Sequence, residues 1–147
     1  MADWRQDIDD LLKHQGFVKK LPELSDHDQT TIQEFLENVG KPAFENISDQ
    51  LNSFQNVRSE VIPAKKTANS VIEPFELFVY KMAQPKLTYR LHFSKKENGV
   101  HINGEYSIPN IYGENSRFQI SSLDRILAGT TEEDIASDFF FILKSKF

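Results

Sequence analysis

Hydrophobic and polar residues alternate through the centre of the chain, as they do in half-buried β-strands. Every second residue is apolar from Leu87 to Phe93, and again from Val100 to Ile108 apart from Gly104. Asn98-Gly99 lies between these two runs and favours a tight type I′ turn, in which both central residues need positive φ. The pattern therefore predicts an antiparallel hairpin with one apolar and one polar face.

The position of the turn sets a register for this hairpin. A two-residue turn at Asn98-Gly99 pairs Glu97 with Val100 and brings His92 opposite Glu105. All apolar side chains then share one face, whereas a shift of one residue would set apolar side chains against polar ones.

The segment before the hairpin is apolar on both alternating faces. One face carries Phe75, Leu77 and Val79, and the other carries Phe78, Tyr80 and Met82. Residues 83–86 allow connections of either parity, so the register of this strand stays open. In both cases apolar groups project onto the polar face of the hairpin. We predict a three-stranded antiparallel meander whose mixed face is half covered, forms a pocket or forms an interface.

Apolar residues at helical spacing precede the meander. Asp3 as N-cap and Gly16 after the last turn bound a first helix over about residues 4–15. Ser25 begins a second helix, and Gly40 is expected to end it. The N-terminal part of the chain is therefore predicted to be helical.

A third helix is predicted from Lys41-Pro42, because proline is tolerated at the first helical position. Its apolar residues follow at near-heptad spacing up to Val61, and Pro63 ends it. They are Phe44, Ile47, Leu51, Phe54, Val57 and Val61. Residues 63–74 are rich in small and polar residues between two prolines, and we expect them to link the helical part (1–62) to the remainder (75–147) within a single domain, 1–147.

The C-terminal part is expected to return to helix. Residues 117–120 fit a short fourth strand, and residues 121–129 fit a short helix capped by Ser121. Thr130 to Glu133 has the spacing of a capping box, which opens the last helix. The Phe139–Leu143 run also favours β-structure, so a strand there is the alternative. The fold class predicted is α+β: N-terminal helices, an antiparallel three- to four-stranded meander, and C-terminal helices.

Composition excludes several classes of function. The chain has 147 residues, a formal net charge of −5 and no cysteine. Residues 1–62 hold 6 Lys or Arg against 12 Asp or Glu, so the acidity belongs to the helical part. Without a basic stripe we expect no nucleic-acid partner. No apolar run approaches the length of a membrane span, and no signal peptide is recognised. We therefore expect a soluble cytoplasmic protein.

The mixed face of the meander holds the candidate ligand or partner residues. They are Arg90, His92, Glu105, His101 and Tyr80. His92 beside Glu105 could act as a general base or begin a metal site. However, two converging side chains are fewer than a zinc site needs, and an ordinary cross-strand charge pair explains them equally. We predict no metal, no cofactor and no catalytic residue.

Three successive aromatic residues near the C-terminus form the second candidate surface. Phe139, Phe140 and Phe141 point in different directions if the segment is helical, so they cannot all face one core. One or two must contact the other side of the sheet or another chain.

These patterns favour a non-enzymatic protein-interaction module that binds another protein or a second copy of itself as a homodimer. The alternative is a small-molecule-binding protein or hydrolase with its pocket on the mixed face, using Arg90, His92, Glu105 and Tyr80.

Overall fold

The computed structural model describes residues 3–17, 24–64, 75–110, 112, 114 and 117–147. The predicted α+β class is confirmed, with N-terminal helices, a five-stranded antiparallel meander and one C-terminal helix. The elements follow in the order α1 (Trp4–His14), α2 (Asp26–Phe35), the π-helical turn η1 (Leu36–Gly40), α3 (Lys41–Asn52), β1 (Val57–Ile62), β2 (Phe75–Lys81), β3 (Gln84–Lys96), β4 (Gly99–Ser107), β5 (Gln119–Ile126) and α4 (Glu132–Lys146).

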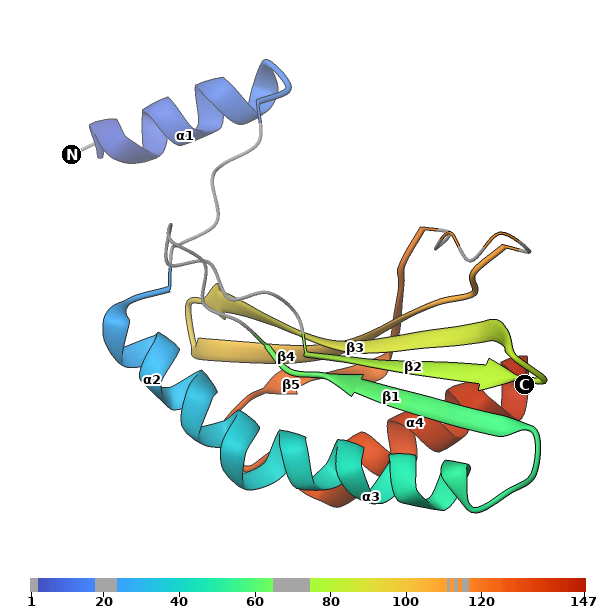
Figure 1. Ribbon diagram of the computed structural model, residues 1–147. Coiled ribbons are helices and arrows are strands. Elements are labelled where there is room, and N and C mark those ends of the chain that lie inside the picture. Colours follow the sequence, from blue (N-terminus) through green and yellow to red (C-terminus); the bar gives the residue numbers. More distant parts are fainter. Residues whose placement is uncertain (1–2, 18–23, 65–74, 111, 113, 115–116) are drawn as a thin grey trace.

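The five strands lie in chain order, so β1 and β5 are the edges of the sheet. Helices α2, α3 and α4 cover one face of the sheet (Figure 1). The core lies between them, where Tyr89 in β3 packs against the rings of Phe44 in α3 and Phe139 in α4. We name the opposite side, which no described helix covers, the outer face.

The sequence predicts that the second N-terminal helix ends at Gly40, and this prediction is wrong. The chain passes through η1 into α3 without leaving helical geometry. Gly40 is buried here, and a Cβ would lie 3.1 Å from the Cδ2 atom of Leu36 and 3.8 Å from the Cδ1 atom of Leu91. This glycine therefore serves close packing of the helix on the sheet rather than termination.

The predicted third helix is too long, because its last part is strand β1. Helix α3 ends at Asn52, and Asn56 has φ of 67°, which interrupts helical geometry. Val57 and Val61 pack against the core from β1 instead. Residues four apart share a face in both a helix and a strand, so their spacing did not distinguish the two. The predicted linker lies largely outside the described residues, which exclude 65–74.

The predicted hairpin exists, but its register is shifted by two residues. Lys96 pairs with Gly99, so His92 faces Asn103 rather than Glu105. Gly99 has φ of 119°, whereas Asn98 is not among the described residues with positive φ. A single positive φ excludes a type I′ turn, in which both central residues have positive φ. A shift by two residues keeps every side chain on its predicted face.

The strand whose register stayed open is now placed. Phe75 pairs with Leu91 and Leu77 with Tyr89, so the odd-numbered residues of β2 face the core. Phe78 and Tyr80 lie on the outer face and are half-buried.

The short helix predicted over residues 121–129 is wrong, because β5 extends from Gln119 to Ile126. Its middle is irregular: Asn103 pairs with Asp124 and Glu105 with Ile120, so Gly104 has no partner in β5. The wide bulge turns residues 121–123 of β5 toward α4.

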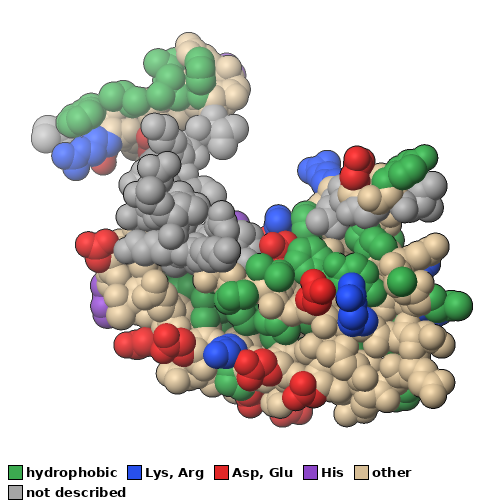
Figure 2. Space-filling view, viewed as in Figure 1, with side chains coloured by type: hydrophobic (Ala, Val, Ile, Leu, Met, Phe, Trp, Pro, Cys, Tyr) green, Lys and Arg blue, Asp and Glu red, His purple; other side chains and the backbone are tan. Residues whose placement is uncertain are grey.

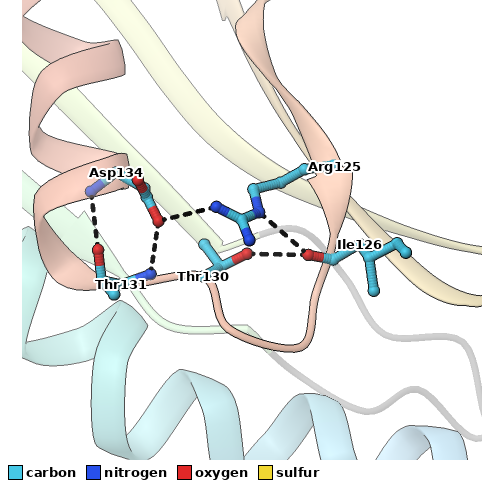
Figure 3. A network of polar contacts seen from close by, with 5 residues as sticks. All are labelled: Arg125, Ile126, Thr130, Thr131 and Asp134. Atoms are coloured by element: carbon cyan, nitrogen blue, oxygen red, sulfur yellow. Dashed lines mark hydrogen bonds and ion pairs between the residues drawn. The ribbon is translucent and has the colours of Figure 1, made fainter.

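Helix α4 confirms the helical interpretation of residues 139–143 over the strand alternative. Its capping box lies one residue later than predicted, with Thr131 as N-cap and Asp134 at N3. Asp134 also accepts a hydrogen bond from the Arg125 Nη1 atom at 3.2 Å. The Ile126 carbonyl, at the end of β5, accepts hydrogen bonds from Arg125 and Thr130 (Figure 3).

Helix α1 is formed as predicted but contributes no buried residue. Figure 1 shows it apart from the other helices, and Figure 2 shows hydrophobic side chains at the surface along it. Among the described residues, no helix is long and apolar enough to cross a membrane.

Candidate functional site

Three of the five predicted residues of the mixed face come together on β3 and β4. Arg90 pairs with Glu105 across the strands, and its Nε atom lies 3.3 Å from the Glu105 Oε1 atom. The guanidinium also lies 3.5 Å from the ring centroid of Phe118, so the cation is stacked as well as paired. Arg90 is therefore already engaged on both sides.

His92 shares the same carboxylate. Its Nδ1 atom lies 3.7 Å from the Oε1 atom of Glu105, which is an ion-pair distance but too long for a hydrogen bond. The His92 side chain is 50% exposed, against 14% for Glu105. Because the Glu105 carboxylate contacts both Arg90 and His92, it is not available as a free general base.

The other two predicted residues lie elsewhere on the outer face. His101 sits near the β3–β4 turn, where its Nε2 atom is 3.1 Å from the Asn98 Oδ1 atom. Tyr80 contacts Arg58, whose guanidinium carbon lies over the Tyr80 ring, 4.6 Å from its centroid. Within the part of the chain that the structure describes, no three His, Asp or Glu side chains are placed to hold a metal ion.

The three C-terminal phenylalanines divide between the core and the surface. Phe139 is 3% exposed and packs on Tyr89, whereas Phe140 and Phe141 are 62% and 61% exposed. Phe141 borders a hollow of about 350 Å³, whose other lining residues are Ser122, Leu123, Asp134, Ser137 and Asp138. An exposed aromatic pair beside a hollow is suited to contact with another chain.

Helix α1 forms a third surface that the sequence analysis did not assign to function. Trp4, Ile8, Leu11 and Leu12 are 64%, 47%, 56% and 42% exposed. They lie on one side of the helix, since their spacing is that of an apolar stripe. The periodicity was visible in the sequence, but a stripe that packs in the core and one that stays exposed have the same pattern.

A buried carboxylate is the most densely hydrogen-bonded group of the described residues, and sequence reasoning missed it. Asp138 in α4 is 4% exposed. It accepts hydrogen bonds from the Tyr89 hydroxyl at 2.6 Å, the Ser121 hydroxyl at 2.5 Å, the Ser122 hydroxyl at 2.7 Å and the Leu123 amide at 3.0 Å. No local motif signals this cluster, because its members come from three separate elements.

The Asp138 cluster is tightly packed as well as hydrogen-bonded. A Cβ on Gly104 would collide with the Asp138 carboxylate and lie 2.8 Å from the Tyr89 hydroxyl. Burial, together with the Asp138 charge and hydrogen bond, raises the pKa of Tyr89 well above 10. The tyrosine therefore stays a neutral donor, and all four hydrogen bonds hold α4 on the sheet.

Comparison with known protein families, curated proteins and solved structures gave no significant match.

Proposed function

We propose that this protein is a non-enzymatic protein-interaction module in which α1 is the docking helix. The observation that carries the proposal is the apolar stripe of α1, whose four large side chains are all exposed. Insertion of such a stripe into an apolar groove is a common mode of helix recognition by a partner protein.

The chain encodes α1 as a helix with defined ends. Asp3 caps its N-terminus by accepting a hydrogen bond from the Arg5 amide at 3.0 Å. At its C-terminus Gly16, with φ of 88°, donates to the Lys13 carbonyl, and the Phe17 amide donates to the Leu12 carbonyl. These two hydrogen bonds form a Schellman motif. A helix of 11 residues is marginal in water without packing, so docking supplies the stabilisation that α1 lacks.

Charge favours a protein partner over a membrane. Residues 3–15 contain four aspartates against Arg5 and Lys13. Helices that lie on anionic membranes are instead rich in basic residues on their polar side. Further acidic side chains are exposed along α2, η1 and α3 (Figure 2), namely Asp26, Glu34, Glu37, Glu45 and Asp49. A groove with Lys or Arg at its rim would complement both regions.

The small-molecule alternative has weaker support. Arg90 and Glu105, its two best candidates, are bound to each other on the outer face. The buried Asp138 carboxylate accepts four hydrogen bonds, so its oxygens have no free position to accept one from a substrate.

Affinity purification of the full chain from its host, with the stripe intact or mutated, tests the proposal. We expect Leu11→Ser to lower the affinity for every specific partner about thirtyfold, since burial of a leucine contributes about 2 kcal/mol. Gln6→Ser, on the polar side of the same helix, is the matched control and should retain binding. Equal recovery of partners by both variants would contradict the proposal.

The single tryptophan of the chain offers an independent readout. Because Trp4 is 64% exposed, the purified protein should show the red-shifted emission of a solvated indole and free access to acrylamide. A blue-shifted, protected Trp4 in the isolated monomer would show that α1 docks on its own chain, and would overturn the proposal.

A further inference from the structure

A second surface, on α4, carries an inference that is independent of α1. The inner side of α4 is buried in the core through Ile135, Asp138, Phe139 and Ile142. The outer side has a stripe at intervals of four, three and four residues, with Phe141 beside it. These residues are Glu133, Ser137, Phe140 and Lys144, and all of them are exposed. Such spacing keeps side chains along one face and suits packing against another helix.

This stripe is complementary to itself when two copies of α4 run antiparallel. If Ser137 of one copy lies opposite Phe140 of the other, Glu133 lies opposite Lys144 of the second copy, because the numbers in each pair have the same sum. The acidic first turn of each helix then meets the basic last turn of the other. Neither Glu133 nor Lys144 has a side-chain ion pair with another described residue. A two-fold axis repeats each contact, as an isologous dimer interface requires.

Size is complementary as well as charge. In the same alignment Phe140 meets Ser137 of the second copy. The hollow of about 350 Å³ that borders Ser137, Asp134 and Phe141 lies beside that serine. It offers space for an aromatic ring from the second copy, in the manner of a knob in a hole. Large side chains thus face small ones on both sides of the axis.

The neighbouring edge of the sheet is less suited to pairing. At the end of β5 the Ile126 carbonyl already accepts hydrogen bonds from Arg125 and Thr130 (Figure 3). At the bulge the Leu123 amide donates to Asp138. Two of the backbone groups at this edge are therefore already engaged within the chain, which makes pairing of two sheets less favourable.

We infer that this protein forms a homodimer through antiparallel packing of α4 on α4 of a second copy, with Phe140 and Phe141 at the centre of the interface. Helix α4 has 15 residues and is therefore about 22 Å long. A pair of such helices buries less than the roughly 800 Å² per partner of a standard interface. The dimer is accordingly weak, and it dissociates in the micromolar range.

Sedimentation velocity over a dilution series of the full chain tests the dimer. The wild type should change from one chain to two as its concentration rises through the micromolar range. Phe140→Ser should raise the dissociation constant at least about tenfold, from the loss of a buried aromatic contact. Leu11→Ser, in the stripe of α1, should leave the dimer unchanged, which separates this inference from the function proposed above.

Charge reversal tests the antiparallel alignment itself. Glu133→Lys and Lys144→Glu should each weaken the dimer, and the double variant should restore it, because the pair is re-formed with reversed signs. Glu132→Lys makes the same change of charge on a different side of the helix and should have a smaller effect. All these positions are exposed, and circular dichroism can verify that each variant is folded.

Three results would each overturn the inference. The first is a mass of a single chain at every concentration of the wild type. The second is a dimer that Phe140→Ser leaves intact, and the third is a dimer that the double charge reversal fails to restore, since either of these places the interface elsewhere.

Discussion

Removal of the Asp138 carboxylate should be among the most destabilising single changes in this protein. In Asp138→Ala the Tyr89 hydroxyl and the Leu123 amide lose their acceptor, and Tyr89 is 0% exposed. A buried polar group without a partner costs about 1–3 kcal/mol. Ser121 and Ser122 are only partly buried and can turn toward water. We therefore expect a loss of about 3–5 kcal/mol, which is a large fraction of the 5–15 kcal/mol typical of a folded domain.

Urea unfolding followed by far-ultraviolet circular dichroism measures this loss. Ser137→Ala is the matched control, because it removes a polar group from the neighbouring exposed position of α4 and should change stability by less than about 0.5 kcal/mol. A loss below about 1 kcal/mol in Asp138→Ala would refute the reasoning, since it would mean that the stranded donors find other acceptors or water.

A double-mutant cycle isolates the contact between Tyr89 and Asp138. Tyr89→Phe removes the donor, so the later loss of Asp138 strands one group fewer. The double variant should therefore be more stable than the sum of the single effects predicts, by about 1–3 kcal/mol. Strict additivity would show that the 2.6 Å contact contributes nothing specific.

Three further changes follow from local geometry. Met82 and Ala83 have φ of 53° and 66° in the β2–β3 turn, so Met82→Asn with Ala83→Gly should raise the free energy of unfolding by about 1–2 kcal/mol; a lower midpoint in urea would contradict this. Because the pKa of Tyr89 is raised by burial, its contribution to stability is complete below about pH 10 and is lost above it. Tyr89→Phe should flatten that alkaline decline, whereas an unchanged profile would exclude Tyr89 as its cause. Hydrogen bonds from the Ser25 amide and from Lys95 lower the pKa of Asp28, so its contribution is present above about pH 4 and is lost as the pH falls. Asp28→Asn should remove that part of the acid dependence, and a thermal melt series at acid pH would detect its persistence.

The faces of β3 and β4 could be predicted, but their register could not. Alternation assigned every residue of the β3–β4 hairpin to its correct side. Its true register differs by two residues, which leaves the alternation unchanged. The choice depends on the turn, where Gly99 alone takes the left-handed conformation. A sequence pattern of period two contains no information that separates these registers.

Two strands were mistaken for helix because their apolar residues are four apart. Val57 and Val61 in β1 share a face, as Leu123 and Leu127 do in the predicted short helix. That interval fits both a helix and a strand. What decided β5 is the hydrogen bonding of its bulge to Asp138, 15–17 residues further along the chain. The local sequence pattern does not predict such a contact.

The candidate surfaces show the same limit. The outer face carries apolar and charged side chains, yet the stacking of Phe118 on Arg90 was not predicted, because nothing in the sequence placed the strand expected over residues 117–120 beside Arg90. Helical geometry, which sets neighbouring residues about 100° apart, predicted that one or two of the three phenylalanines leave the core, and Phe140 and Phe141 are the exposed ones. The exposed stripe of α1 could not be told from the buried stripe of α2, because amphipathicity does not reveal what a helix packs against.

The arrangement of exposed and satisfied groups assigns different roles to sheet and helices. At one edge of the sheet the Ser59 amide donates to the Asn52 side chain at 2.7 Å, and at the other the Ile126 carbonyl is covered by Arg125 and Thr130. Both edges thus have backbone groups engaged within the chain, which opposes growth of the sheet by another strand. The most exposed aromatic side chains outside loops and turns lie instead on α1 and α4. Helical surfaces are therefore the better candidates for association with other proteins, and the Asp138 cluster fixes α4 on the sheet.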